Sequence, residues 1–456
     1  MKIVPRRSVS HLPRYGTAGN LPALITLTCV IGLTLSPLGC GRKAEQPDVE
    51  KPIVSEPEPM AVADDPDAVA ALRDAGFILK TGSDGNVTEF SIASQTDISE
   101  SFVHLAGIPS TRVATFTGPG ITAAGMDNLA VLTRLQRLDL TDSAIEPAVL
   151  DVVGKLNNLE ALFLRRTPVT DESLAALTAL PKLRALDLRN TNISDAGMKH
   201  VAKIRTLQDV QLEKSKVNDP GVAMLAGLPL TSFNVNYCTT ISDSSLAVLG
   251  KIPSLRSIQL DATKITDEGM RHVAELKNLT RLRIRETDVT GEGLAHIAGL
   301  TNLQRIELRG TSLDDAGLAI IAKLPKVTYL DIAECRLVSP EGMKAIGGLT
   351  GLTYLGFWET KLDDEALAAL EGLKSLVELD LKATQITDEA VASILQFQEL
   401  QSLNVAGTQL TDDGFQQLTG LPKLKKINVA NTNIGYDMID TLAEMNDGIQ
   451  VIEFGD

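Results

Sequence analysis

The residues best suited to binding chemistry lie between positions 281 and 358, where arginine, tyrosine and the single tryptophan of the chain recur at regular spacing. They are Arg281, Arg283, Arg285, Arg305, Arg309, Tyr329, Tyr354 and Trp358. These residue types most often anchor protein interfaces, because their side chains combine a large buried area with directed hydrogen bonds. We interpret the eight residues as a candidate partner-binding surface.

A 24-residue period positions these side chains. The segments LEALFLRRTPVTDESLAALTALPK (159–182) and LRALDLRNTNISDAGMKHVAKIRT (183–206) share leucine at the first, fourth and sixth places and threonine at the ninth. Fifteen such units begin between Val87 and Leu424, and a partial strand with Ile452 and Phe454 follows. The LxL part has the period of a strand, and the later LxxLxxL part has the spacing of a helix. Since no unit can bury both faces alone, we expect the units to stack.

The repeat resembles the leucine-rich repeat family over most of the chain, and its ITDxxL segment is most similar to the cysteine-containing subclass found in F-box proteins. We find no F-box-like segment before the repeats. The resemblance implies an α/β solenoid of horseshoe shape, with a parallel sheet on the concave face and helices on the convex face. We expect the repeat domain over residues 87–456 and an N-terminal cap, made of a helix and the start of a hairpin, over residues 65–86.

The third, fifth and seventh places of each unit should point to solvent on the concave face. In-register strands then put Arg281 beside Arg305 and Arg285 beside Arg309, each pair about 4.8 Å apart. Like charges so placed destabilise a sheet unless other groups pair them. A second, weaker candidate surface comprises Arg165, Arg189 and Phe163.

Trp358 takes the seventh place of its unit, so we expect its ring on the open concave face and its neighbour Phe357 in the core. The alternative to binding is an internal mesh without a partner. In that arrangement Glu307 and Asp331 pair the arginines, and Trp358 lies over Lys382 of the next strand.

Threonine fills the ninth place of most units, where a hydroxyl can satisfy backbone groups of a buried turn. Cys238 and Cys335 take the same place in units four apart. Strand spacing separates them by about 19 Å, which is too far for a disulfide.

An aspartate column follows the turn, and we expect each aspartate to cap its repeat's helix. A calcium ladder is the alternative. The column comprises Asp171, Asp195, Asp219, Asp243, Asp267, Asp315, Asp364, Asp388 and Asp412.

Catalytic and metal-binding groups do not converge in this pattern. His104, His200, His272 and His296 all take the eighteenth place, on the outer helices. A catalytic base or a clustered metal site requires such side chains to meet. We therefore predict no enzymatic activity, no cofactor and no metal site.

The first 40 residues read as an export signal, because a basic stretch precedes the apolar run LPALITLTCVIGLTLSPLG (21–39). The end SPLGC resembles a bacterial lipoprotein lipobox, which implies lipidation of Cys40, although Pro37 departs from that motif. An uncleaved membrane anchor is the alternative. Residues 41–64 are rich in Pro and Glu, which is typical of an extended tether.

A net charge of −15 excludes a general nucleic-acid-binding role. The sequence predicts an exported protein, anchored to a membrane at the cell envelope, that binds another protein through its concave face. Two alternatives remain: an envelope protein that binds acidic glycans, and a structural spacer without a specific ligand.

Overall fold

The computed structural model describes residues 62–454. The predicted signal segment (1–40), with the lipidation candidate Cys40, lies outside the described residues, as does most of the predicted tether (41–64).

One 17-stranded sheet runs the length of this region. Its first pair, β1 with β2, is antiparallel, and every later pair from β2 to β17 is parallel and joins consecutive strands. The strands are β1 (Ile78–Thr81), β2 (Val87–Ala93), β3 (Val113–Thr117), β4 (Arg137–Asp139), β5 (Ala161–Phe163), β6 (Ala185–Asp187), β7 (Asp209–Gln211), β8 (Ser232–Asn234), β9 (Ser257–Gln259), β10 (Arg281–Arg283), β11 (Arg305–Glu307), β12 (Tyr329–Asp331), β13 (Tyr354–Gly356), β14 (Glu378–Asp380), β15 (Ser402–Asn404), β16 (Lys426–Asn428) and β17 (Gln450–Ile452).

Short helices return the chain from one strand to the next. The α-helices are α1 (Pro66–Asp74), α2 (Val149–Val153), α3 (Asp195–Val201), α4 (Asp219–Ala223), α5 (Asp243–Leu249), α6 (Asp267–Val273), α7 (Gly291–Leu294), α8 (Asp315–Ile321), α9 (Pro340–Met343), α10 (Asp364–Ala368), α11 (Val391–Ile394), α12 (Asp412–Leu418) and α13 (Tyr436–Ala443). The 3₁₀ segments are η1 (Ser99–Gly107), η2 (Met126–Val131), η3 (Ser173–Ala179), η4 (Ala295–Ile297), η5 (Lys344–Gly348), η6 (Asp388–Ala390) and η7 (Met445–Asp447).

Several predicted helices are 3₁₀ rather than α. In η3 the buried residues Leu174 and Leu177, followed by Leu180, recur every third position. A 3₁₀ helix has three residues per turn, so this spacing keeps all three side chains on one face. The short LxxLxxL segment is therefore satisfied by either helix type.

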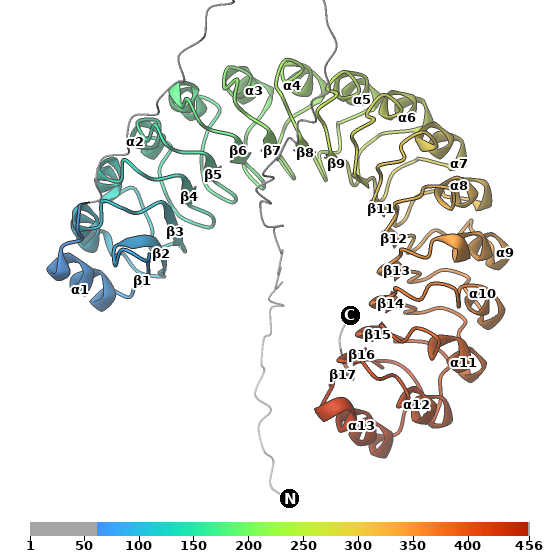
Figure 1. Ribbon diagram of the computed structural model, residues 1–456. Coiled ribbons are helices and arrows are strands. Elements are labelled where there is room, and N and C mark those ends of the chain that lie inside the picture. The colour runs from blue at the N-terminus through green and yellow to red at the C-terminus, as the bar shows by residue number, and fades with distance from the viewer. Residues whose placement is uncertain (1–61, 455–456) are drawn as a thin grey trace, which may run out of the picture. The chain divides into compact units, whose positions relative to one another are not determined.

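The strands line the inner side of an arc and the helices line its outer side (Figure 1). The core lies between these layers and is continuous from Leu72 to Ile449. Its members include the leucines of the first, fourth and sixth places, such as Leu159, Leu162 and Leu164, which are fully buried. The predicted fold class, a leucine-rich-repeat solenoid, is confirmed. None of the helices in residues 62–454 has the length and apolarity needed to cross a bilayer.

The N-terminal edge of the sheet is covered by α1 and the β1–β2 hairpin. The N–H of Asp65 donates to the carbonyl of Gly107 at 2.8 Å, so α1 joins η1 of the first repeat. Phe77 packs on Phe90 and Phe102 with ring centroids 5.6 and 6.4 Å apart. These aromatic contacts tie residues 66–81 to the solenoid core.

Ninth-place hydroxyls bond to the turn backbone as predicted. The hydroxyl of Thr167 donates to the carbonyl of Leu164 at 2.6 Å, and the same bond recurs in the other threonine units. Cys238 and Cys335 are buried free thiols in this place. Burial raises the pKa of Cys335 to about 11, so its thiol stays protonated at neutral pH.

The prediction that the aspartate column caps the helices is wrong by one residue. In α6 the N-cap is Thr266, whose side chain accepts from the N–H of Glu268, and Asp267 is the first helical residue. Serine or threonine immediately before the aspartate takes the same role in α3 and α7. The residue before the column, rather than the column aspartate, supplies the cap because it has the extended backbone conformation that a cap requires; in α8 this residue is Asp314 and in α10 it is Asp363.

The aspartates instead bridge consecutive repeats. Each carboxylate accepts the backbone N–H of the residue before the next repeat's helix, at 2.7–2.9 Å, and where that residue is Ser or Thr it also accepts the hydroxyl. Asp243, for example, binds the N–H and hydroxyl of Thr266 at 2.8 and 2.7 Å. A Cβ at Gly269 would lie 2.2 Å from Asp243 Oδ1, so glycine makes room for the bridge. The column therefore acts as an inter-repeat ladder on the helical side of the fold.

Replacing Asp243 with alanine is expected to lower the free energy of unfolding by about 1–3 kcal/mol, because it leaves the N–H of Thr266 without an acceptor. Urea unfolding followed by circular dichroism measures the change. Asp243→Asn is the matched control, since its amide oxygen can still accept this N–H, and it should lose less stability. Equal stability of the alanine variant and the native chain would show that the ladder contributes nothing.

Candidate binding surface on the concave face

Strands β10 to β13 bring the predicted residues together on the concave face. Arg281 pairs in register with Arg305, Arg305 with Tyr329, and Tyr329 with Tyr354. The first of these pairings was predicted from the repeat. The intervening fourth-place residues, such as Leu282, are fully buried on the opposite side.

Glu307 holds the two neighbouring arginines of the third place. Its Oε1 accepts from Arg281 Nη2 at 2.8 Å and from Arg305 Nε at 2.6 Å. The Glu307 side chain is only 4% exposed, whereas those of Arg281 and Arg305 are 31% and 38% exposed. One buried carboxylate thus removes the repulsion expected between these like charges.

Asp261 has the same role for Arg283 and Arg285. Its Oδ2 accepts from Arg283 Nε at 2.6 Å and from Arg285 Nε at 2.8 Å, while its Oδ1 accepts the backbone N–H of Arg285 at 3.0 Å. The Asp261 side chain is 0% exposed. Burial raises the pKa of Asp261, and the charge of Arg285 opposes that rise.

Arg309 is held by a carboxylate and an aromatic ring. Its Nη2 donates to Glu334 Oε1 at 2.7 Å, and its guanidinium carbon lies 4.2 Å from the centre of the Trp358 ring. The ammonium of Lys382 lies 4.8 Å from the centre of the same ring. Trp358 is half-buried on the concave face, while Phe357 is fully buried in the core, as predicted. The indole N–H of Trp358 has no hydrogen-bond partner among the residues that the structure describes.

The rings of Tyr329 and Tyr354 form a stack capped by an arginine. Their centroids are 3.9 Å apart with an interplanar angle of 4°. The guanidinium carbon of Arg305 lies 3.5 Å from the centre of the Tyr329 ring, on the other side of the stack. Tyr354 also covers Gly356, where an added Cβ would lie 3.0 Å from the tyrosine hydroxyl oxygen.

The internal mesh considered as an alternative to binding is present in part. Glu307 pairs arginines and Lys382 lies over Trp358, as that alternative proposed. Asp331 forms no ion pair among residues 62–454, and Asp261 and Glu334 provide the other carboxylates. Reasoning from the sequence missed these two acids. Asp261 stands at the seventh place of the preceding unit, so comparison along that column could have found it.

Among residues 62–454, the second, weaker candidate surface is internally paired at Arg189 and Phe163 but not at Arg165 Nε. Arg189 donates from Nη2 to Asp187 at 2.6 Å, and the guanidinium carbon of Arg137 lies 3.9 Å from the centre of the Phe163 ring. Arg165 Nε is buried without a hydrogen-bond partner in the described part of the chain.

Asp331 gives the surface a pH dependence that can be measured. Burial raises the pKa of Asp331, although its carboxylate accepts the N–H of Ala333 at 3.1 Å. A carboxyl group whose pKa is higher in the folded state binds more protons there, so its contribution to stability falls as pH rises above about 4. Asn404 accepts the corresponding N–H two residues on, at 3.2 Å, so asparagine is compatible with this turn.

Asp331→Asn is therefore expected to raise the free energy of unfolding at pH 7 and to reduce its decline between about pH 4 and pH 7. Urea unfolding at several pH values measures both effects. Lower stability of the variant at pH 7 would contradict the prediction, and would mean that the Asp331 charge is needed by the nearby arginines.

The four histidines of residues 62–454 lie in the helical layer, on the opposite side of the core from the concave surface. His200 lies in α3 and His272 in α6, while His104 and His296 lie in η1 and η4. Their helical positions agree with the prediction. Within the described residues, no group of three or more His, Cys, Asp or Glu side chains could hold a metal ion.

Comparison with known proteins supports the fold. A family model described as Leucine Rich repeat matches residues 179–202 and 323–347. No curated protein gives a significant match. A leucine-rich-repeat protein of Leptospira interrogans has 18% sequence identity and a TM-score of 0.50, and the alignment covers 76% of this chain and 91% of that one.

Two further solved structures are similar in outline. An internalin of Listeria monocytogenes has 17% identity and a TM-score of 0.42, with 85% of this chain and 94% of that one covered. The Arabidopsis receptor kinase HAESA, solved with a peptide hormone and a co-receptor, has 13% identity and a TM-score of 0.45, with 83% and 80% covered. The two matched repeats and the parallel-sheet architecture show that this chain has the fold of a leucine-rich-repeat solenoid.

Proposed function

We propose that this protein is a non-catalytic scaffold that binds another protein across the concave surface of β10 to β13. Solenoids commonly use such extended concave faces for recognition. The observation that carries the proposal is the contiguous set of half-buried arginine and aromatic side chains held in fixed positions by buried carboxylates. Side chains fixed before binding lose little entropy when a partner docks.

The arginines keep donors for a partner despite their internal pairs. A guanidinium group has five N–H donors, and Arg305 uses only its Nε in hydrogen bonds to the described residues. Its side chain is 38% exposed and its guanidinium lies over Tyr329, and its terminal nitrogens can donate to backbone carbonyls or carboxylates of a partner.

Protein is favoured over an acidic glycan because of charge. Glu307, Asp261 and Glu334 lie among the five arginines, so the surface lacks the strong positive field that a polyanion requires. We therefore place acidic glycans second, and the inert spacer third.

The proposal includes export and attachment to a membrane at the cell envelope. It rests on the basic stretch, the apolar run and the lipobox-like SPLGC of residues 1–40. The repeat pattern of the chain also resembles the cysteine-containing leucine-rich-repeat subclass, and we include membership of that subclass in the proposal. Cys40→Ser should abolish incorporation of labelled fatty acid and release the protein from the membrane fraction of a bacterial host. Unchanged membrane association without lipid would favour an uncleaved anchor.

Affinity capture from an envelope extract tests the binding surface. The bait is the full chain, compared with the double variant Arg309→Ala, Trp358→Ala. The matched control is Arg271→Ala, Tyr436→Ala, which removes an arginine and an aromatic ring from helices on the outer side. For a partner retained by the native chain, we expect about a 30-fold or greater loss of affinity in the concave variant, at 1 kcal/mol or more per anchor residue.

The control variant should bind as the native chain does. Equal retention by all three baits would move the binding site away from β10 to β13. Loss of binding on addition of free acidic polysaccharide would favour the glycan alternative, and no retained species would favour the spacer.

A further inference from the structure

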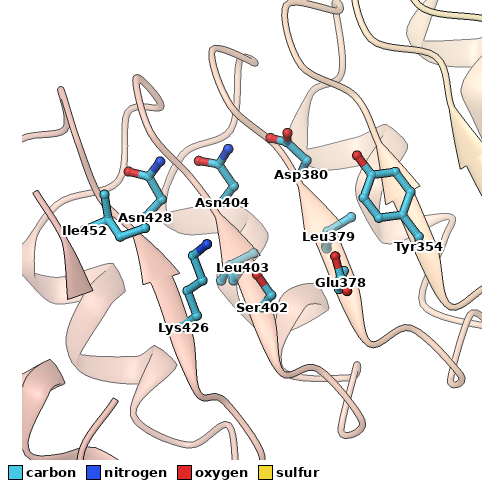
Figure 2. Close-up of a pocket in the computed structure, with 10 residues that line it drawn as sticks. All are labelled: Tyr354, Glu378, Leu379, Asp380, Ser402, Leu403, Asn404, Lys426, Asn428 and Ile452. Carbon is cyan, nitrogen blue, oxygen red and sulfur yellow. The ribbon is translucent and has the colours of Figure 1, made fainter. Parts of the chain in front are cut away.

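A pocket opens on the concave face beside the tyrosine stack, across β13 to β17 (Figure 2). Its volume is about 160 Å³. Tyr354 stands at one end, and Asp380 and Asn404 form part of a row above Glu378 and Ser402 (Figure 2). An engineered cavity of about 150 Å³ accommodates benzene, so this pocket has room for a planar group of similar size.

Tyr354 is half-buried and lines this pocket. Tyr329 covers one face of its ring at a centroid distance of 3.9 Å. At the opposite end of the stack, the guanidinium of Arg305 covers Tyr329 at 3.5 Å. The stack is therefore capped by a cation at the β11 end, whereas at the β14 end, where the pocket begins, the in-register neighbour of Tyr354 is the carboxylate residue Glu378.

Carboxylates accompany both ends of the stack. Glu307, which lies in β11 at the fifth place of its repeat unit, accepts a hydrogen bond from Arg305 Nε. At the pocket end, Glu378 is exposed and forms no ion pair or hydrogen bond with the described residues. Asp380 is half-buried, its Oδ1 accepts the backbone N–H of Lys382 at 2.9 Å, and the side chain of Asn404 also interacts with its carboxylate. A carboxylate has about four lone-pair sites, so it can still accept from a ligand. Burial raises the pKa of Asp380, so a nearby cation would stabilise its ionised form.

The one cationic residue among the described residues that line the pocket is three strands from the tyrosine. Lys426 lines the pocket from β16, three strands from Tyr354, and forms no ion pair with the described residues. The lining next to Tyr354 thus carries two carboxylates, although the charge of Lys382, outside the lining, acts on Asp380. Cations bind favourably over an aromatic face, and a neighbouring carboxylate strengthens the attraction.

We propose that this pocket binds the guanidinium group of an arginine side chain presented by the protein partner. The group would continue the stack on the side of Tyr354 away from Tyr329 and donate hydrogen bonds to Glu378 and Asp380, as Arg305 does with Tyr329 and Glu307 at the other end. The inference rests on the proposed function and specifies one anchor of the partner. Arginine fits better than lysine because its planar group stacks on a ring and reaches two acceptors at once.

Defined peptides test the inference without a natural partner. The probe is a fluorescein-labelled peptide of glycine and serine with one central arginine, titrated with the full chain in mild detergent and followed by fluorescence anisotropy. Matched peptides carry lysine or citrulline, which keeps the shape of arginine but lacks the charge. We expect the arginine peptide to bind about tenfold more tightly than the citrulline peptide, with lysine between them.

Protein variants locate the binding. Asp380→Asn should weaken the arginine peptide about tenfold and Glu378→Gln about fivefold, since the latter carboxylate is exposed. Glu389→Gln is the matched control, because it removes the same charge from the helical side of the same repeat, and its affinity should not change. Circular dichroism confirms that each variant is folded.

Equal affinity for the three peptides, no binding at millimolar concentrations, or equal affinity of Glu378→Gln and Glu389→Gln would overturn the inference. These outcomes leave the proposed function separately testable, because the capture experiment depends on Arg309 and Trp358 and not on the pocket. A captured partner that keeps full affinity for Glu378→Gln and Asp380→Asn would support the proposed function and refute the arginine anchor.

Discussion

Replacing Asp261 with alanine is expected to lower the free energy of unfolding by about 3–5 kcal/mol. The substitution removes a fully buried carboxylate that binds Arg283 and Arg285 and accepts the backbone N–H of Arg285. The two guanidinium groups, which are only 19% and 21% exposed, would remain without that counter-charge. Urea unfolding at pH 7 measures the loss.

Two further variants separate charge from hydrogen bonding at Asp261. Asp261→Asn keeps an acceptor for the Arg285 N–H and should retain part of the stability. Adding Arg283→Leu to Asp261→Ala should recover stability relative to the single alanine variant, because it removes a half-buried arginine that would otherwise keep only the 3.7 Å contact with Glu307. The loss of stability in the double variant is compared with the sum of the losses in Asp261→Ala and Arg283→Leu alone. If the double variant loses as much as that sum or more, the buried ion pair is not the source of the effect.

Phe357→Ala is expected to cost about 3–5 kcal/mol, because it empties a fully buried position of the core between the sheet and the helices. Trp358→Ala, one residue later, should cost about 1–2 kcal/mol, since its ring is half-buried and loses mainly its contacts with Arg309 and Lys382. Adjacent aromatic residues on opposite sides of one segment thus have different roles.

Thermal unfolding and partner capture distinguish these roles. Phe357→Ala should lower the melting temperature strongly and leave concave binding intact below that temperature. Trp358→Ala should lower the melting temperature only slightly and weaken concave binding. Similar melting losses for both variants would show that Trp358 serves packing rather than recognition.

Much of the fold could be predicted because the spacing of apolar residues within each repeat, and the constant length of the repeats, fix which side chains are buried and which strands are neighbours. Alternation within LxL assigns Leu282 to the core and Arg281 and Arg283 to the concave face. The constant 24-residue period then aligns Arg281 with Arg305 on the neighbouring strand. The placement of the eight candidate residues follows from these two periods alone.

The aspartate column shows where local reasoning was insufficient. Asp243 precedes an apolar helical stripe, which is typical of a cap, yet its carboxylate binds Thr266 of the next repeat. Both arrangements satisfy the same sequence pattern. The choice between capping the same helix and binding the next repeat depends on the distance between stacked repeats. That distance cannot be read from the sequence of one repeat.

The sequence by itself determined the repeat, the layers and the face on which each side chain lies, because strand and helix periods are local properties of the chain. Only the tertiary structure decided which acid each arginine meets and that the Tyr329–Tyr354 stack ends at a pocket lined by Glu378. Arginine side chains are long enough to reach acids on their own strand or on either neighbour, so the pairing depends on three-dimensional distances and rotamers that sequence spacing does not specify.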